Sequence, residues 1–105
     1  MFTHTHLVVG PMLPKQKMTL EYPYYDIDII SWTTSCGCSD GIDDKLGGKF
    51  RVTYTANDIP PHLLDKGGYT TEQYIIIKHR VENSTEEQTL KLTFKATIHD
   101  AKRRG

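Results

Sequence analysis

The sequence predicts an all-β protein, a small immunoglobulin-like β-sandwich of six or seven antiparallel strands. Apolar and polar residues alternate with a period of two in several segments, most clearly over 88–98 and 49–56, and such alternation is typical of strands with one buried face. No segment shows the 3.6-residue period with capping residues that a helix of ten or more residues needs. Turn residues separate the periodic segments at fairly regular intervals, as they do in small sandwiches.

The N-terminal half contains three segments that predict strands. Residues 7–9 are apolar and precede Pro11, which favours a short edge strand. Residues 17–22 alternate polar and apolar side chains, and residues 27–32 form a further extended run. Three strands are therefore expected here, and Trp32 is expected to lie in the core because large aromatic side chains are common core anchors.

A further strand is predicted over 49–56. Phe50, Val52 and Tyr54 alternate there with polar residues, directly after the turn signal at 47–48. This alternation places the three apolar side chains on one face of a sheet.

The C-terminal part predicts an antiparallel hairpin. Apolar and β-branched side chains fill both faces of 74–77, which indicates a mid-sheet strand that is covered on each side or faces a partner. Residues 82–87 form a polar loop of hairpin length, so 73–81 and 88–98 should pair antiparallel. A longer loop is expected over 57–72.

Length and charge limit the class of protein. The chain has 105 residues, which predicts a single domain over 1–105 with an N-terminal arm (1–14) and a short basic C-terminal tail (101–105). Its 13 basic and 13 acidic side chains cancel, which argues against a general nucleic-acid binder. No apolar run approaches the length of a membrane span, and the first residues do not have the pattern of a secretory leader. We therefore expect no direct nucleic-acid partner, no membrane segment and no signal peptide.

Cys36 and Cys38 flank a glycine at the end of the predicted strand 27–32, and glycine permits the turn that such a corner needs. Two thiolates at this spacing supply half of a tetrahedral Zn²⁺ or Cu⁺ site. The histidines that could complete it are His4, His6, His62, His79 and His99. A pair of free thiols is favoured over this metal site, and also over a disulfide, because an i, i+2 bridge closes a very small ring. No cofactor is expected.

The segment 29–38, which reads I-I-S-W-T-T-S-C-G-C, resembles a motif of a bacterial and phage family of unknown function with short immunoglobulin-like domains. Residues 48–52 and 90–92 resemble later strands of that family, so the resemblance covers 18–98. It implies an immunoglobulin-like domain of the leaderless, phage-encoded type. Such versions resemble small proteins of tailed phages that decorate capsids or join tail parts.

Charged residues are unevenly distributed along the chain. The stretch 21–44 holds six acidic side chains and no Lys or Arg, whereas the tail carries Lys102, Arg103 and Arg104. This contrast predicts contacts with neighbouring copies or with an oppositely charged partner, and a merely solvated surface is the alternative. The Asp-rich segment 40–44 is expected to form a turn and not a Ca²⁺ site, because it lacks the order of an EF-hand loop.

Aromatic and terminal residues form the candidate interface. Tyr24 and Tyr25 are consecutive, so in an extended chain they face opposite sides and one of them must point outward. The arm and the tail are expected to reach neighbouring subunits. The candidate interface residues are Tyr24, Tyr25, His4, His6, Lys102, Arg103 and Arg104.

These patterns predict a protein that acts by binding and not an enzyme. The sequence has no nucleophile–base signature, phosphate-binding loop or paired-carboxylate motif. We expect a structural protein of a phage virion, a capsid decoration (cement) protein or another small head or tail component, made in the host cytoplasm and present in many copies beside viral capsid or tail proteins. The alternatives are a metal-binding or redox module built on the Cys-Gly-Cys turn and an envelope-associated binding domain.

Overall fold

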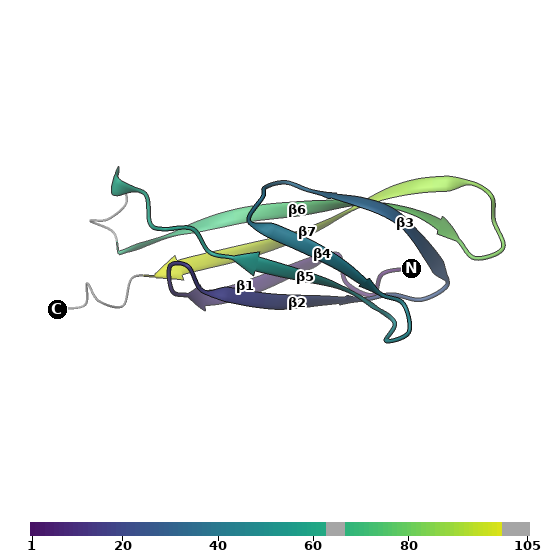
Figure 1. The fold of residues 1–105 in the computed structure, drawn as a ribbon, viewed down its shortest axis with the longest axis horizontal. Coiled ribbons are helices and arrows are strands. Elements are labelled where there is room, and N and C mark those ends of the chain that lie inside the picture. The colour runs from purple at the N-terminus through teal and green to yellow at the C-terminus, as the bar shows by residue number, and fades with distance from the viewer. Residues whose placement is uncertain (63–66, 100–105) are drawn as a thin grey trace.

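The structure is a computed structural model that describes residues 1–62 and 67–99. Seven strands form two sheets that pack face to face (Figure 1), which confirms the predicted all-β sandwich. The strands are β1 (His6–Met12), β2 (Lys17–Pro23), β3 (Ile27–Thr34), β4 (Ser39–Asp44), β5 (Lys49–Thr55), β6 (Gly68–Val81) and β7 (Glu87–His99). Among the described residues, no helix is both long and apolar enough to cross a membrane.

The larger sheet has the strand order β1-β7-β6-β3. β6 and β7 form the predicted hairpin, which pairs from Gly68 opposite His99 to Arg80 opposite Glu87 and runs along most of the length of the molecule (Figure 1). β6 begins at Gly68, so the loop expected over 57–72 is shorter than predicted, because residues 68–72 pair with β7.

One pairing departs from the predicted antiparallel arrangement. β1 pairs with β7 in parallel, with Leu7 opposite Phe94 and Val9 opposite Ala96. The register places Leu7 and Val9 beside inward-facing β7 residues, so this edge strand contributes apolar side chains to the core. The long connection through all the other strands permits this parallel pairing, whereas a short hairpin would impose antiparallel pairing.

The smaller sheet has the order β2-β5-β4, with both pairs antiparallel. β2, β4 and β5 thus lie in one sheet while β3, β6 and β7 lie in the other, which is the division found in immunoglobulin-like sandwiches. The prediction of a turn over 40–44 was wrong, because this segment belongs to β4. The inward-facing residues of β4 are Ser39 and Gly41, so the strand has no inward apolar side chains to reveal its period.

The core lies between the two sheets and is lined by the apolar residues that the period-two pattern places inward. Phe94 of β7 meets Tyr54 of β5 edge to face, with ring centroids 5.1 Å apart, so this contact joins the two sheets. The residues that are entirely buried include Tyr22, Phe50, Val52, Ile75, Ile77, Leu92, Phe94, Ala96 and Ile98.

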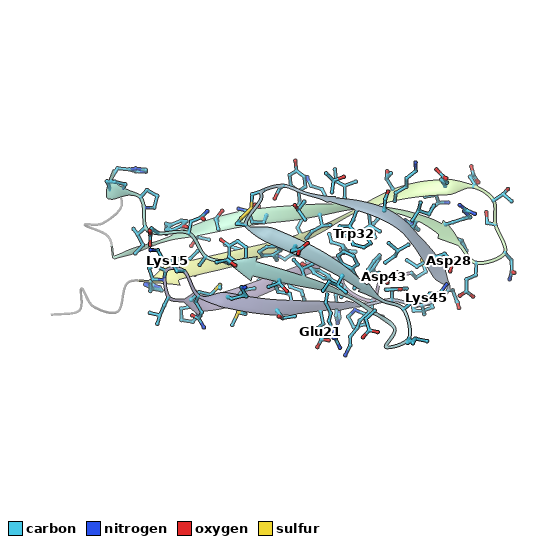
Figure 2. All side chains as sticks on the ribbon, in the orientation of Figure 1. Lys15, Glu21, Asp28, Trp32, Asp43 and Lys45 are labelled. Atoms are coloured by element: carbon cyan, nitrogen blue, oxygen red, sulfur yellow. A yellow bond between two sulfur atoms is a disulfide. The ribbon has the colours of Figure 1, made fainter. Side chains whose placement is uncertain are left out.

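Trp32 was predicted to lie in the core, and the structure places it at the rim of the core. Its side chain remains 36% exposed, and its ring packs edge-on against Phe50 at a centroid distance of 5.0 Å. A Cβ on Gly41 would lie 2.6 Å from Trp32 Nε1, so the missing side chain at this position of β4 makes room for the indole. Trp32 therefore covers the gap between β3 and β4 at the rim of the core (Figure 2).

Candidate interaction surface and the Cys36–Cys38 corner

The connection between β3 and β4 is a tight corner closed by a disulfide between Cys36 and Cys38, whose Cα atoms are 5.3 Å apart (Figure 2). Ser35 N–H donates to Tyr74 O at 2.9 Å, and Ser35 Oγ accepts from Tyr74 N–H at 3.0 Å. On the other side, Thr55 N–H donates to Cys38 O at 2.9 Å. The corner is thus tied to both sheets, because Tyr74 belongs to β6 and Thr55 to β5.

The disulfide replaces the free thiols that the sequence favoured. Sulfurs in a disulfide are not thiolates, so the pair can bind a metal ion only after reduction. Within residues 1–62 and 67–99, no group of three or more His, Cys, Asp or Glu side chains is arranged to hold a metal ion. A metal site at Cys36 and Cys38 therefore stays a prediction for the reduced protein.

Removal of this disulfide should cost little stability. The bridge spans only two peptide steps, and the loop-entropy relation gives about 1.6 kcal/mol for so small a ring. We expect a Cys36→Ser/Cys38→Ser variant to unfold at slightly lower urea concentration than the oxidised wild type. Its free energy of unfolding should be lower by at most about 1.6 kcal/mol. Equilibrium denaturation followed by Trp32 fluorescence measures the difference. The reduced wild type serves as the control and should match the variant, and a loss of several kcal/mol would contradict this reading of the corner.

The two consecutive tyrosines point in opposite directions, as their alternation predicts. Tyr24 is buried and donates its hydroxyl to Asp43 Oδ1, whereas Tyr25 is 55% exposed. Burial raises the pKa of the Tyr24 phenol, and the hydrogen bond to Asp43 raises this pKa further. Of the two candidate interface tyrosines, the structure therefore places only Tyr25 at the surface.

The terminal candidates have different surroundings. His4 and His6 are exposed, and His6 Nδ1 lies 2.7 Å from Thr93 Oγ1 of β7. Residues 6–12 form β1, and Phe2 makes an isolated bridge with Tyr24, so much of the segment expected as an arm packs on its own domain. Lys102, Arg103 and Arg104 lie outside the described residues.

The acidic stretch 21–44 meets basic side chains from the turn after β4 and from β5, which the linear sequence could not show. Glu21 pairs with Lys49 at 2.8 Å and with Arg51 at 3.2 Å. Arg51 also pairs with Asp44 at 3.2 Å, and Lys45 binds Asp28. Figure 2 shows Asp28, Asp43 and Lys45 gathered in one half of the molecule. Much of the charge contrast predicted to face a partner is thus satisfied within the chain.

Glu21 provides a test of this charge pairing. The hydrogen bond from Lys49, together with the positive charges of Lys49 and Arg51, holds the pKa of the Glu21 carboxyl below its ordinary value. The ionised carboxylate therefore stabilises the fold above that ordinary pKa, and the contribution disappears as the pH falls through the lowered pKa. We expect Glu21→Gln to lose less stability than wild type between neutral and strongly acidic pH, as measured by urea denaturation. High salt should reduce this difference between the wild type and Glu21→Gln. If the stabilities of the two proteins fell equally with falling pH, the pairing of Glu21 with Lys49 and Arg51 would be contradicted.

One pocket, of about 220 Å³, lies at the N-terminal end of the sandwich and is bordered by Phe2, Ile27, His79 and Leu90, among others. His79 is buried, and its Nδ1 has no hydrogen-bond partner among the described residues. The other side chains that line the pocket are apolar, hydroxyl or amide groups. Among the described residues that line the pocket, His79 is the only one with a titratable side chain.

A group of exposed apolar residues lies on the β3 side of the larger sheet. We call Ile30, Trp32, Tyr74 and Ile76 the β3 patch, and their exposed fractions are 39%, 36%, 38% and 40%. Tyr74 and Ile76 lie on the outer face of the sheet, whereas Trp32, opposite Ile77, lies at the edge of its inner face. Ile76 lies directly beside Thr33 of β3 in the sheet. The run 74–77 was predicted to be covered on both faces or to face a partner, and within this chain only Ile75 and Ile77 are covered. The exposure of Ile30 was not anticipated, because it depends on a bulge between Ile29 and Ser31.

Comparisons with protein-family models, with curated proteins and with solved structures give no match to this chain. The site is therefore defined by the fold itself: a β-sandwich with a disulfide-closed corner and an apolar patch beside one sheet edge.

Proposed function

We propose that this chain is a non-enzymatic structural protein of a phage virion that binds neighbouring subunits, as a capsid decoration (cement) protein or another small head or tail component. The observation that carries the binding role is the β3 patch. Tyr74 and Ile76 are exposed on the outer face of β6, and Ile30 and Trp32 are exposed at the adjacent β3 edge. Exposed apolar groups that cluster on a folded surface mark interaction sites, and aromatic residues are enriched in the centres of such sites.

The surroundings of the β3 patch determine which protein surface can cover it. Lys78 pairs with Glu87 at 3.0 Å, and the Lys91 ammonium lies 4.7 Å from the centroid of the Tyr74 ring. Lys78 is already paired within the chain, whereas the Lys91 ammonium keeps its full charge over the Tyr74 ring. A protein that covers Ile76 and Tyr74 is therefore expected to leave Lys91 at the solvated rim of the contact or to supply an acidic side chain for it.

The virion is proposed from the resemblance of 29–38 and of the later strands to leaderless, phage-encoded immunoglobulin-like domains. A subunit that binds the assembled shell and not its dissociated parts stabilises the shell by mass action. Such a role requires a stable folded module and a contact surface, and it requires no catalytic group.

The test is sedimentation of the purified protein with candidate phage capsids at low and high salt. We expect wild-type protein to co-sediment in a fixed ratio to the capsid subunits, and binding should survive high salt because the β3 patch is apolar. Ile76→Lys should abolish co-sedimentation, since it places a charge in the patch. Val8→Lys is the matched control, because Val8 is 71% exposed on β1 at the opposite edge of the same sheet. Absence of wild-type binding, or equal binding by both variants, would contradict the proposal.

A second candidate function is a metal-binding or redox module at the corner, favoured by the disulfide between two partly exposed cysteines. Reduction would produce two adjacent thiols that could bind a soft metal ion. A thiol titration of the reduced protein with and without Zn²⁺ tests this function. A genuine site would protect both cysteines and release protons as it fills, whereas unchanged reactivity would exclude it.

A further inference from the structure

The sandwich has four edge strands, and they differ in how well they are protected against pairing with another strand. Proteins commonly block a sheet edge with charged side chains or proline, because its unpaired backbone groups otherwise bind a further strand. β1 contains Pro11, β2 carries Lys17 and Pro23, and β4 carries three aspartates. β3 has a bulge between Ile29 and Ser31, and residues 31–34 beyond it include no charged residue, no proline and no further register shift.

The pairing between β3 and β6 shows which backbone groups of β3 are directed at the free edge. Ser35 N–H donates to Tyr74 O, so Ser35 faces β6 in a hydrogen-bonded position. Hydrogen-bonded and non-hydrogen-bonded positions alternate along an antiparallel ladder, and Thr34 and Trp32 therefore occupy non-hydrogen-bonded positions opposite Ile75 and Ile77. The N–H and C=O groups of Trp32 and Thr34 point away from β6. Among the described strands, β3 pairs with β6 alone.

The side chains at the β3 edge are neutral, and this neutrality determines which strands could pair with it without charge repulsion. A two-fold symmetric contact brings the same surface of two copies together, so the surface must be complementary to itself. The β4 edge, with Asp40, Asp43 and Asp44, would repel its own copy. The β3 edge has one nearby acidic residue, Asp28, which is bound to Lys45 of the same chain. Charge therefore allows two β3 edges to meet and gives no preference for an oppositely charged partner.

We propose that the β3 edge binds the β3 edge of a second copy of this chain in antiparallel orientation. The regular stretch Ser31 to Thr34, which follows the bulge, would form the ladder, and the two larger sheets would join into one continuous sheet of eight strands, four from each copy. Ile30 and Trp32 lie at this edge, whereas Tyr74 and Ile76 lie one strand away on the outer face of β6 and stay exposed in the contact. The β3–β3 contact is therefore separate from the outer face of the proposed capsid contact and goes beyond the proposed function.

Two pairs of variants test the contact by sedimentation velocity over a wide concentration range. Thr34→Pro removes a backbone donor that faces the free edge and leaves the β3–β6 bonds intact, whereas Thr34→Val removes the same hydroxyl but keeps the donor. Ile30→Lys puts a charge in the neutral edge of both copies, and Val8→Lys puts the same charge on the opposite edge.

We expect a concentration-dependent dimer for wild type, Thr34→Val and Val8→Lys. In Ile30→Lys the dissociation constant should rise by about tenfold or more, because a charged side chain at a strand edge opposes pairing with a further strand, and Thr34→Pro should also shift to monomer. Circular dichroism of each variant verifies that the fold is retained. A wild type that stays monomeric up to millimolar concentration would overturn the inference, as would a dimer that Ile30→Lys and Thr34→Pro leave intact.

The inference and the proposed function can fail separately. A monomeric wild type that binds capsids, and loses this binding with Ile76→Lys, would overturn the β3–β3 contact and support the virion role. A dimer that is sensitive to Ile30→Lys but binds no capsid would support the contact and contradict the virion role.

Discussion

Replacement of Phe94 by alanine is expected to lower the free energy of unfolding by about 3–5 kcal/mol, the range for truncation of a large buried aromatic side chain. Phe94 is entirely buried and packs against Tyr54 of the opposite sheet. Its loss would leave a cavity between the sheets and remove a contact that joins them. Because small domains are stable by only about 5–15 kcal/mol, the variant should be near the limit of folding.

Urea denaturation followed by circular dichroism measures this loss. Lys95→Ala on the same strand is the control, since Lys95 is exposed, and a surface substitution of this kind is expected to change stability by no more than about 0.5 kcal/mol. Equal stabilities of the two variants would contradict the position of Phe94 in the core.

The second large effect is expected at Gly41. A Cβ at this position would lie 2.6 Å from Phe50 Cζ and 2.6 Å from Trp32 Nε1. Alanine would therefore force the Trp32 indole or the Phe50 ring to move, and overpacking of this kind costs about 1–3 kcal/mol. We expect Gly41→Ala to unfold at lower urea concentration and to shift Trp32 fluorescence to the red, because a displaced indole becomes more exposed to water.

A matched control is available at the neighbouring corner. A Cβ on Gly37 would meet no atom within 4 Å, so Gly37→Ala should leave both the stability and the Trp32 emission close to those of wild type. If Gly41→Ala were as stable as Gly37→Ala, the packing of Trp32 over β4 would be wrong.

Elements whose buried residues are large and apolar could be predicted from the sequence. β5 and β7 have inward side chains such as Phe50 and Phe94 at a visible period of two, and β6 contains the β-branched apolar run 74–77, so all three strands could be predicted without tertiary information. β4 was missed for the opposite reason. Its inward positions are Ser39 and Gly41, because the space above Gly41 is filled by Trp32 from another strand. When a side chain from one strand fills the space beside another strand, the local sequence of the second strand has no apolar residue that indicates its buried face.

The candidate site was only partly predictable from the residues. Alternation correctly indicated that one of Tyr24 and Tyr25 is outward, but the choice between them depends on the contact of Tyr24 with Asp43. The acidic stretch was expected to be unopposed, and it meets Lys49 and Arg51 only because β5 pairs with β2 and β4. Sequence position cannot show which charges face each other across a sheet.

The disulfide was not favoured because ring size alone argues against an i, i+2 bridge. In the structure the corner is held from both sides, by Tyr74 of β6 and Thr55 of β5, and these bonds keep Cys36 and Cys38 close together. The tertiary contacts that orient the two cysteines were invisible in the local motif.

Amide hydrogen exchange at β3 tests most directly the central claim that this protein works by contact through the β3 side of its larger sheet. In the dilute free protein, the Trp32 and Thr34 amides should exchange quickly, since they point at a free edge, while the Thr33 amide that faces β6 should be protected. On association with a second copy, the Trp32 and Thr34 amides should become protected. If the protein dimerises while the exchange of both amides stays unchanged, another surface carries the contact and the account is contradicted.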